Sequence, residues 1–395
     1  MSLRWWFLLC LLLAACAHGP SAVRPGVLVV ENGVLVDGLG GPPVPRARVV
    51  MRGGLVAAAG SMDRVPAPAG AEVLDAEGGT ILPGLVDAHV HGVADPAVRR
   101  SLLESGVTLV CNVGAPWSDL PGLRQDTWNG LPVARAVYAG PVLTPPGGYP
   151  GPVHGRAYAL EASGAAGVEA AVERLHAAGA TMLKLAFEPG REGSCDPGRA
   201  LPVFAPDEAR AAVARAHALG MTVRAHVEDA AMLDRALDAG VDVVEHAPVR
   251  RCGSGPDLEP LLRRMVARGV ILTPTLGAGV RSTWDNGPLL GLVGRYAALG
   301  GAVATGTDAP FAGLRHGPPL EEMELLSRAG LAPMEVLLAG TAVAARACGR
   351  IGQGRIAPGM AADLIVVPGD PLADPGVLAR PRWVVLGGVV AKHGD

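Results

Sequence analysis

Residues 84–92, GLVDAHVHG, are the stretch from which the fold and the chemistry of this chain can be inferred. Side chains two positions apart in a β-strand point to the same face. His89 and His91 therefore share a face with Asp87, and the apolar residues between them face the other way. Two imidazoles placed in this way at a strand end can bind one metal ion. Taken alone, the pattern fits an ordinary strand end equally well, so the rest of the chain has to decide.

Length and composition limit the classes of protein to consider. The chain has 395 residues, which predicts about two domains, and 49% of the residues are hydrophobic, which is enough for large cores. The formal net charge is −3 and no basic run is present, so we expect no nucleic-acid partner. The expected partner is a small-molecule substrate. The sequence is compatible with an oligomer and leaves the oligomeric state open.

The N-terminus has the features of a secretory signal peptide. Arg4 precedes an apolar run over residues 5–15, which is too short to cross a bilayer comfortably. The run ends LAAC, which resembles the lipobox of bacterial lipoproteins. We therefore predict a signal peptide over residues 1–15, a lipid on Cys16 that anchors the chain at a membrane, and a tether over 16–25. Ala17 stands where an inner-membrane retention signal would have Asp, which favours the periplasmic face of the outer membrane. An ordinary signal peptide cleaved nearby is the alternative.

An oxidising compartment makes disulfides stable, so the cysteines outside the predicted signal peptide need an assignment. Cys111 lies in an apolar strand and Cys348 near a helix end, and we expect both to be buried and inert. Cys195 and Cys252 both lie in polar, glycine-rich loops, and our hypothesis is that they form a disulfide. Four cysteines allow three pairings, so the sequence alone leaves this choice open.

The two ends of the chain resemble each other in pattern. Residues 26–83 contain short β-type runs such as VLVVENG and RVVMRGGLVAAAG, and residues 351–395 contain ADLIVVPGD and RPRWVVLGGVVAKHG. Neither end has enough strands to bury a sheet alone. We therefore predict one discontinuous β-sandwich domain built from both ends.

Between them, residues 84–350 alternate between apolar strands and Ala/Leu/Arg-rich helices, as in 168–178, 206–219 and 318–329. Eight alternating pairs over this length predict an α/β fold, a (β/α)₈ TIM barrel. A doubly wound sheet is the second choice, because no glycine-rich phosphate fingerprint follows the first strand. The strands are expected near 85–90, 107–113, 132–139, 181–187, 221–226, 241–246, 270–275 and 302–307.

Metal-competent side chains recur at the C-terminal ends of these strands, where a barrel places its reactive groups. Each has a structural explanation when it is taken alone; Asp308, for example, could cap a helix. Together they predict a metal site at one rim. The members, from the first, fourth, fifth, sixth and eighth strands, are His89, His91, Lys184, His226, His246 and Asp308.

Lys184 is the most informative of these residues, because the chain contains only two lysines. Both faces of a barrel strand are covered by protein. The face with Leu183 and Leu185 should meet the helices, so the lysine should point into the barrel. Burial and nearby positive charge favour a neutral amine there. Such an amine can add carbon dioxide and become an anionic carbamate ligand. The alternative is an ion pair with an acid such as Glu188 or Glu245.

Taken together, GLVDAHVH, the strand lysine, RAHVED, VEHA and GTDAP resemble the amidohydrolase superfamily, of the imidazolonepropionase-like and Xaa-Pro dipeptidase-like type. The flanking ENGVLVDG and IGQGRIAPGMAADLIVVPGDPL resemble that family's sandwich segments. The resemblance implies two divalent metal ions, usually zinc. His89, His91 and Asp308 would hold one ion. His226 and His246 would hold the other, with carbon dioxide bound as a carbamate on Lys184 between them.

The resemblance also implies a reaction. A metal-bridging hydroxide would attack a carbonyl and cleave a C–N amide bond, and Asp308 would carry the proton to the leaving amine. The implied substrates are small peptides of the Xaa-Pro or Xaa-Arg/Lys type, or cyclic amides. The alternatives are a lactonase or phosphotriesterase-like hydrolase on the same metals, and a non-catalytic, ligand-binding lipoprotein. The sequence does not determine the metal's identity.

Candidate substrate contacts are less specific. Residues 140–155, GPVLTPPGGYPGPVHG, follow the third strand and supply Tyr149 and His154, although a mobile loop explains them equally well. His316, in LRHGPPLEEMEL, could reach the pocket or merely cap the next helix. Relatives often have histidine near the position of Tyr149, and arginine-aspartate where this chain has Cys111-Asn112, so the pocket chemistry here should differ.

Overall fold

The computed structural model describes residues 26–189, 200–249, 257–282 and 286–392 of the chain. Within them it has an α/β fold, which confirms the predicted class. The predicted signal peptide, the tether with Cys16, and the predicted pair Cys195 and Cys252 lie outside the described residues. No helix in the described ranges combines the length and the apolarity needed to cross a membrane.

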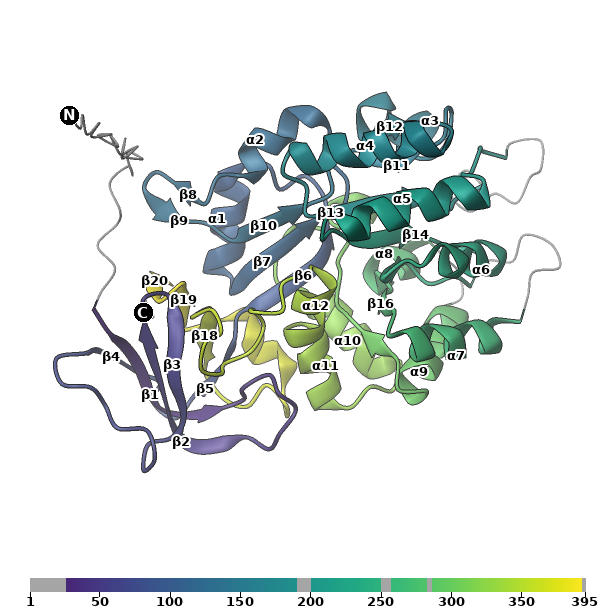
Figure 1. Ribbon diagram of the computed structural model, residues 1–395. Helices are drawn as coiled ribbons and strands as arrows, with labels where there is room; N and C mark the ends of the chain where they lie inside the picture. The colour runs from purple at the N-terminus through teal and green to yellow at the C-terminus, as the bar shows by residue number, and fades with distance from the viewer. Residues whose placement is uncertain (1–25, 190–199, 250–256, 283–285, 393–395) are drawn as a thin grey trace, which may run out of the picture.

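Strands from both ends of the chain form one eight-stranded sheet with the order β20-β19-β18-β5-β1-β2-β3, in which β4 also pairs with β1. The two ends meet where β5 pairs antiparallel with β18, in the register of Leu82 with Ile365. Figure 1 shows the purple and yellow strands side by side. The strands are β1 (Leu28–Leu35), β2 (Val44–Arg52), β3 (Leu55–Ser61), β4 (Glu72–Asp75), β5 (Thr80–Pro83), β18 (Leu364–Val367), β19 (Trp383–Leu386) and β20 (Val389–Lys392).

The central strands are parallel and fall into two sheets, with the orders β10-β7-β6 and β12-β11-β13-β14-β15-β16-β17. Most run as continuous buried apolar stretches, as expected when both faces of a sheet are covered. A further short antiparallel pair joins β8 (Thr127–Trp128) and β9 (Leu131–Pro132). The parallel strands are β6 (Leu85–Val90), β7 (Val107–Asn112), β10 (Arg135–Tyr138), β11 (Val142–Thr144), β12 (Ala159–Glu161), β13 (Met182–Ala186), β14 (Thr222–His226), β15 (Val243–Glu245), β16 (Ile271–Thr273) and β17 (Ala302–Val303).

Backbone hydrogen bonds connect the two parallel sheets at both ends. On one side the amide of Ala88 donates to Thr305 at 3.0 Å, and the amide of His91 donates to Ala309 at 2.8 Å. On the other side Thr181 donates to Tyr138 at 3.2 Å. The strand pairing itself does not form the continuous eight-stranded barrel that the sequence predicts. At the break between β17 and β6 the reason is local, because β17 is only two residues long and the chain after it adopts irregular backbone towards Asp308, which has φ +61°.

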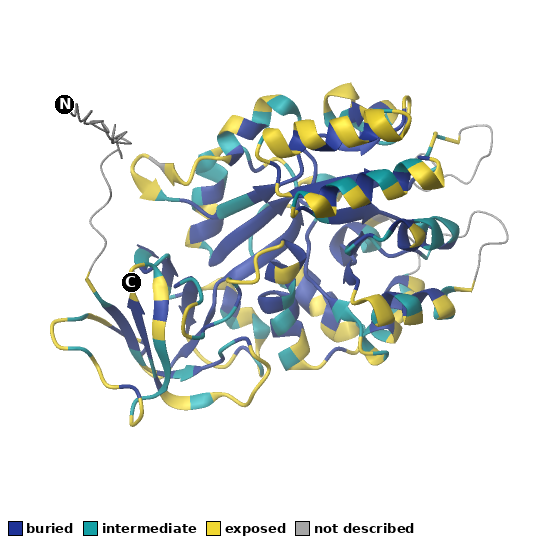
Figure 2. Ribbon diagram, in the orientation of Figure 1, coloured by how far each residue is buried: buried dark blue, intermediate teal, exposed yellow. Residues whose placement is uncertain are grey.

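Helices follow most of the parallel strands and cover their outer side. Figure 2 shows buried strands enclosed by helices whose outer faces are exposed. The side chains Leu183, Leu185 and Phe187 of the β13 region pack with these helices, whereas Met182 packs in an inner cluster with Val86. The helices are α1 (Pro96–Glu104), α2 (Leu120–Leu123), α3 (Gly151–His154), α4 (Ala165–Ala177), α5 (Pro206–Ala218), α6 (Ala230–Ala239), α7 (Leu258–Arg268), α8 (Leu276–Ser282), α9 (Gly287–Ala298), α10 (Leu320–Arg328), α11 (Pro333–Ala339) and α12 (Ala342–Ala347).

Short-range sequence signals determine where several of these helices begin and end. At the start of α6 the Asp229 carboxylate accepts the amide of Ala231 at 2.8 Å, and Gly240 ends the helix with φ +93°. Asp257 and Gly269 bound α7 in the same way. An aspartate satisfies amides that the first turn leaves without partners, and glycine adopts the left-handed conformation of the last turn at little cost.

One expectation about the cysteines is wrong. Cys111 in β7 and Cys348 after α12 are both buried, but they are joined in a disulfide and are not inert free thiols. Their Cα atoms are 5.9 Å apart, within the range that a disulfide requires. The two residues are 237 positions apart, so composition and spacing carried no signal for this pairing.

Candidate metal centre

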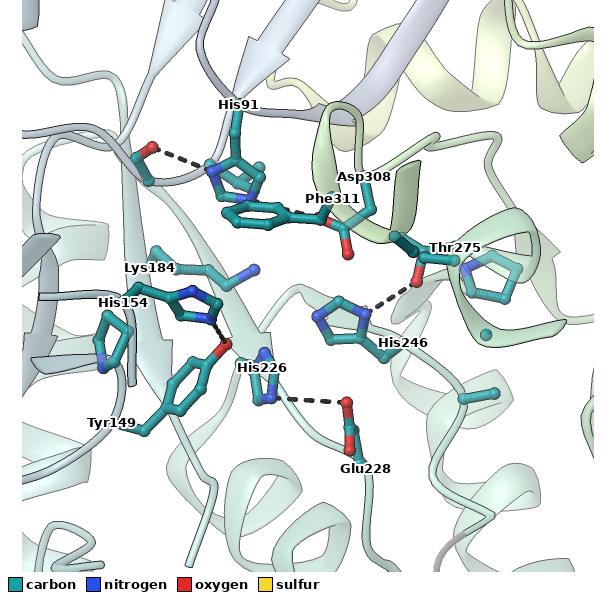
Figure 3. Close-up of a pocket in the computed structure, with 18 of the residues that line it drawn as sticks. His91, Tyr149, His154, Lys184, His226, Glu228, His246, Thr275, Asp308 and Phe311 are labelled. Atoms are coloured by element: carbon teal, nitrogen blue, oxygen red, sulfur yellow. Dashed lines mark hydrogen bonds and ion pairs between the residues drawn. The ribbon is translucent and has the colours of Figure 1, made fainter. Parts of the chain in front are cut away.

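Five of the six predicted ligands lie at or beyond the carboxyl ends of the parallel strands, and Lys184 lies inside a strand. His89 belongs to β6 and His91 follows it, Lys184 lies within β13, and His226 ends β14. His246 comes directly after β15, and Asp308 lies in the irregular segment after β17. Both adopt a backbone conformation that non-glycine residues rarely adopt, with φ +68° for His246 and φ +61° for Asp308. Figure 3 shows five of the side chains, from His91 to Asp308, directed towards one cavity.

One group of donor atoms brings together residues from β6, β15 and the segment after β17. Ligand atoms of His89, His246 and Asp308 all lie within 4.8 Å of one another. The Asp308 carboxylate oxygen Oδ1 is 3.2 Å from His89 Nε2 and 3.4 Å from His91 Nε2. Imidazole nitrogens and a carboxylate oxygen are the donors that divalent zinc takes. This group therefore has the chemistry of a metal site.

The other ring nitrogen of each of three histidines has its own partner. His89 Nδ1 donates to the carboxylate of Glu245 at 2.7 Å, and His91 Nδ1 donates to the backbone oxygen of Gly114 at 3.0 Å. His246 Nδ1 is hydrogen-bonded to the hydroxyl of Thr275 at 2.8 Å. A hydrogen bond at one imidazole nitrogen orients the ring and leaves the lone pair of the other for a metal. The anchored rings therefore fit a metal-binding role.

A buried ion pair supports His89 from behind. Glu245, which accepts from His89, also accepts from Nε of Arg224, and both side chains are fully buried. The guanidinium donates in addition to the backbone oxygens of Ala88 and Ala347, each at 2.6 Å. Burial opposes ionisation of Glu245, but the charges of Arg224 and Lys184 hold its pKa well below its ordinary value. The sequence analysis considered Glu245 only as a partner for the lysine, and it missed Arg224. The available signal was that Arg224 lies two positions before His226 in an apolar strand, so both side chains share a face.

Asp308 is positioned by a second buried carboxylate. Asp87 accepts the hydroxyl of Thr307 at 2.6 Å and the Thr307 amide at 3.0 Å, as well as the amide of His89 at 3.1 Å. Gly306 makes this close approach feasible, because an added Cβ there would lie 2.6 Å from the Cβ of His89. The first strand and the segment after β17 are therefore locked together where both supply ligands.

Burial and charge adjust the protonation states of the centre. Burial lowers the pKa of His91 and, together with the charges of the neighbouring histidines, lowers that of His246 well below its ordinary value. Burial also opposes protonation of His89, but the charges of Glu245 and Asp308 outweigh it and raise the pKa of that ring. For Asp308, the His89 charge and the hydrogen bonds from the histidines outweigh burial and hold its pKa well below its ordinary value. These shifts favour an ionised Asp308 carboxylate and neutral rings at His91 and His246, the forms in which these groups bind a metal, whereas the raised pKa of His89 favours its protonated form until a cation takes the place of the proton.

Lys184 lies in the same cavity as the histidines. Figure 3 shows its side chain extending from β13 into the space between His91, His226 and His246. Burial lowers the pKa of its amine to about 8, against the attraction of Glu245. A substantial fraction of the amine is therefore neutral near pH 8. Glu245, one of the acids that a purely structural lysine could pair with, is bonded to His89 and Arg224.

A second donor group surrounds His226. Its Nε2 lies 3.6 Å from Glu188 Oε2 and 3.9 Å from Glu228 Oε1, and ligand atoms of the three residues lie within 4.8 Å of one another. The ring of His226 is 4.4 Å from that of His246, centroid to centroid, so the two groups adjoin. The sequence analysis grouped His226 with His246 and Lys184, and it considered Glu188 only as a partner for the lysine.

The predicted substrate contacts divide into two cases. Tyr149 and His154 both line the cavity, and the Tyr149 hydroxyl is hydrogen-bonded to His154 Nε2 at 3.0 Å. The ring of Tyr149 lies over His226 at 4.5 Å, and His154 lies 5.0 Å from Phe311. His316 is not among the lining residues; its Nε2 donates to the backbone oxygen of His91 at 2.8 Å. It thus supports the first strand.

Parallel strands with a cluster of histidine and carboxylate donors at their carboxyl ends define a class of metal-dependent α/β hydrolases. The chain belongs to the Amidohydrolase family, whose model matches residues 80–391. It is 32% identical to an uncharacterised protein of Mycobacterium tuberculosis over 334 residues, which cover 79% of this chain and 85% of that protein.

Solved structures show the same fold. A Xaa-Pro dipeptidase with methionine bound in its active site superposes with a TM-score of 0.79 at 24% identity, over 92% of this chain and 99% of that one. A prolidase complexed with N-methylphosphonate-L-proline gives a TM-score of 0.75 at 25% identity, over 93% and 100%. Membership of the Amidohydrolase family, together with the donor groups, supports a metal-binding hydrolase that acts on amide bonds.

Proposed function

We propose that this protein is a binuclear metal-dependent amidohydrolase that cleaves the C–N bond of a small amide. One ion would be held by His89, His91 and Asp308, and the other by His226 and His246 with Lys184 between them. The observation that carries the proposal is the convergence of these donors: Asp308 Oδ1 lies 3.2 Å from His89 Nε2 and 3.4 Å from His91 Nε2, and the adjoining rings of His226 and His246 are 4.4 Å apart, centroid to centroid. Zinc is the first candidate, because the donors are mainly imidazole.

Bound divalent cations would supply the acidity that makes water a nucleophile near neutral pH and would polarise the scissile carbonyl. The chain's own residues handle the proton. Asp308 is ionised and borders the cavity, so it can accept a proton from the attacking water and deliver it to the leaving amine. The Tyr149 hydroxyl and His154 border the same cavity and can hold the substrate carbonyl or its leaving group.

We further propose that Lys184 carries a carbamate, formed when its neutral amine adds carbon dioxide and releases a proton. Its position beside three histidines and its pKa of about 8 support this modification. Labelled bicarbonate should give a carbamate carbon signal in NMR spectra of the metal-loaded protein, and Lys184→Met should abolish that signal. An unchanged signal in the variant would contradict the assignment.

The remaining architecture and location follow as proposals. The hydrogen bonds between the two parallel sheets support a closed (β/α)₈ barrel over residues 84–350, with a β-sandwich contributed by 26–83 and 351–395. The LAAC sequence supports a signal peptide, a lipid on Cys16 and a location on the periplasmic face of the outer membrane. Mass spectrometry of the N-terminal peptide from a bacterial host tests the lipid.

The test of the function combines metal analysis with a substrate panel. We expect about two metal ions per chain for a binuclear centre and hydrolysis within a panel of Xaa-Pro and Xaa-Arg dipeptides and cyclic amides. Lactones and aryl phosphates are included to test for the alternative hydrolases. Absence of any bound ion would favour a ligand-binding lipoprotein. Asp308→Asn should lower kcat by about 10²–10⁴ while much of the metal stays bound. Near-normal turnover in that variant would refute the proton-transfer role.

A further inference from the structure

The cavity above the donor atoms is large and mostly apolar. It has a volume of about 820 Å³, towards the upper end of the range for sites that enclose a drug-sized ligand. Metal donors and the polar residues Tyr149, His154 and Thr275 form one part of its lining. The rest of the wall includes apolar side chains from separate loops and helices, among them Val249, Leu289 and Phe311.

Two helices and an aromatic group shape this wall. Leu289 at the start of α9 packs against α8, since a Cβ added to Gly279 would lie 3.1 Å from a Leu289 methyl carbon. On another side Phe311 lies 4.9 Å from the ring of His91 and 5.0 Å from that of His154. Figure 3 shows the Phe311 ring facing the cavity. The space next to the donors is thus bounded by aliphatic and aromatic groups.

The described part of the wall offers little positive charge for the α-carboxylate of a dipeptide. A free α-carboxylate needs a cationic partner when it is buried, because an unpaired buried charge is costly. Among the described lining residues the only cationic side chain besides the histidines is Lys184, and it belongs to the metal centre of the proposed function. The described lining contains no arginine. An uncharged amide meets no such cost in this cavity.

We propose that the substrate is an uncharged amide with an extended apolar acyl group that packs against Leu289 and Phe311. This inference rests on the proposed amide hydrolysis and narrows its substrate class. An apolar wall recognises chain length by burial, and each methylene buried in the transition state should raise kcat/KM about fourfold until the cavity is filled. The amide lies at the donors and the acyl chain extends along α8 and α9.

The experiment compares acetyl, butanoyl, hexanoyl and octanoyl p-nitroanilides with Xaa-Pro and Xaa-Arg dipeptides, using the metal-loaded full chain. The matched variants are Leu289→Ala and Leu292→Ala, because both leucines lie on α9 and are 6% exposed but only Leu289 lines the cavity. The octanoyl-to-acetyl ratio of kcat/KM should fall about tenfold in Leu289→Ala and stay at the wild-type value in Leu292→Ala.

The outcomes separate the two proposals. Cleavage of dipeptides in preference to every anilide, with no effect of chain length, would overturn the apolar substrate class and leave amide hydrolysis standing. Failure to cleave any amide of the panel would refute the proposed amide hydrolysis. In that case calorimetric binding of the uncharged acyl series decides the inference independently. Affinity that rises with chain length supports it, and equal affinity across the series overturns it.

Discussion

Glu245→Gln is the perturbation that most directly tests the support of the centre. The carboxylate accepts from His89 at 2.7 Å and from Arg224, and the three side chains are at most 1% exposed. Glutamine keeps the volume, but it has a single acceptor oxygen and an NH₂ group that faces the second donor. The guanidinium of Arg224 then stays buried without a counter-charge.

The expected magnitude follows from that geometry. Removing one partner of a buried ion pair destabilises a protein by about 3–5 kcal/mol. The loss of the hydrogen bond to His89 should also weaken metal binding about 10–100-fold, because the ring is no longer held in its metal-binding tautomer. Glu321→Gln is the matched control, since its pair with Arg281 is largely exposed and should contribute less than about 1 kcal/mol.

The assay is urea-induced unfolding of the metal-free protein, followed by zinc titration with a competing chelator. The pH dependence adds a second readout. Because the folded pKa of Glu245 lies below its ordinary value of 4.5, its stabilising contribution is present above about pH 4.5 and is lost as the pH falls through the folded pKa. The stability difference between wild type and Glu245→Gln should therefore shrink in acid. If Glu245→Gln costs no more stability than Glu321→Gln and binds zinc equally well, the reasoning about the buried pair is wrong.

Three further predictions test other parts of the structure. Gly306→Ala should abolish tight metal binding, because the added Cβ would lie 2.6 Å from the Cβ of His89. Gly317→Ala is the control and should keep its metal, because a Cβ added there has no atom within 4 Å. Equal metal contents in the two variants would contradict this prediction. Burial raises the pKa of Glu322 to about 8, so its stabilising contribution is present below about pH 4.5 and is lost as the pH rises through 8. Glu322→Gln should flatten the fall in stability over that window, and an identical pH profile would count against the assignment. Cys111→Ala removes the buried disulfide and should lower the free energy of unfolding by about 2–5 kcal/mol. Unfolding curves of the wild type with and without reductant check this. If reductant leaves the stability of the wild type unchanged, the prediction is wrong.

Much of the fold could be predicted because its signals are local. The period-two pattern of 84–92 places His89 and His91 on one face, and the structure has a strand at Leu85–Val90. The apolar runs near 181–187 and 221–226 likewise correspond to Met182–Ala186 and Thr222–His226. Whether a segment forms a strand depends largely on the pattern of residues adjacent in the chain, so strands can be predicted from a single sequence. The short β11 and β12 were missed; β11 lies in the proline- and glycine-rich segment 140–155, which has the composition of a loop.

The contacts that support the centre could not be predicted in the same way. Arg224 and Glu245 are 21 positions apart, and Asp87 and Thr307 are 220 apart. Nothing in the local sequence states which buried acid faces which donor, because that pairing is created only when strands from distant parts of the chain align. The disulfide between Cys111 and Cys348 was not predicted for the same reason.

By itself, the sequence determined the types of donor atoms and the ends of the strands on which they stand. It did so because strand periodicity and the polarity of parallel sheets follow from covalent geometry and hydrophobic pattern. Only the tertiary structure decided which ring nitrogen of each histidine is hydrogen-bonded. It also placed Glu188 and Glu228 beside His226 and gave the cavity a mostly apolar wall. Those properties depend on distances between residues remote along the chain, and such distances arise only from packing.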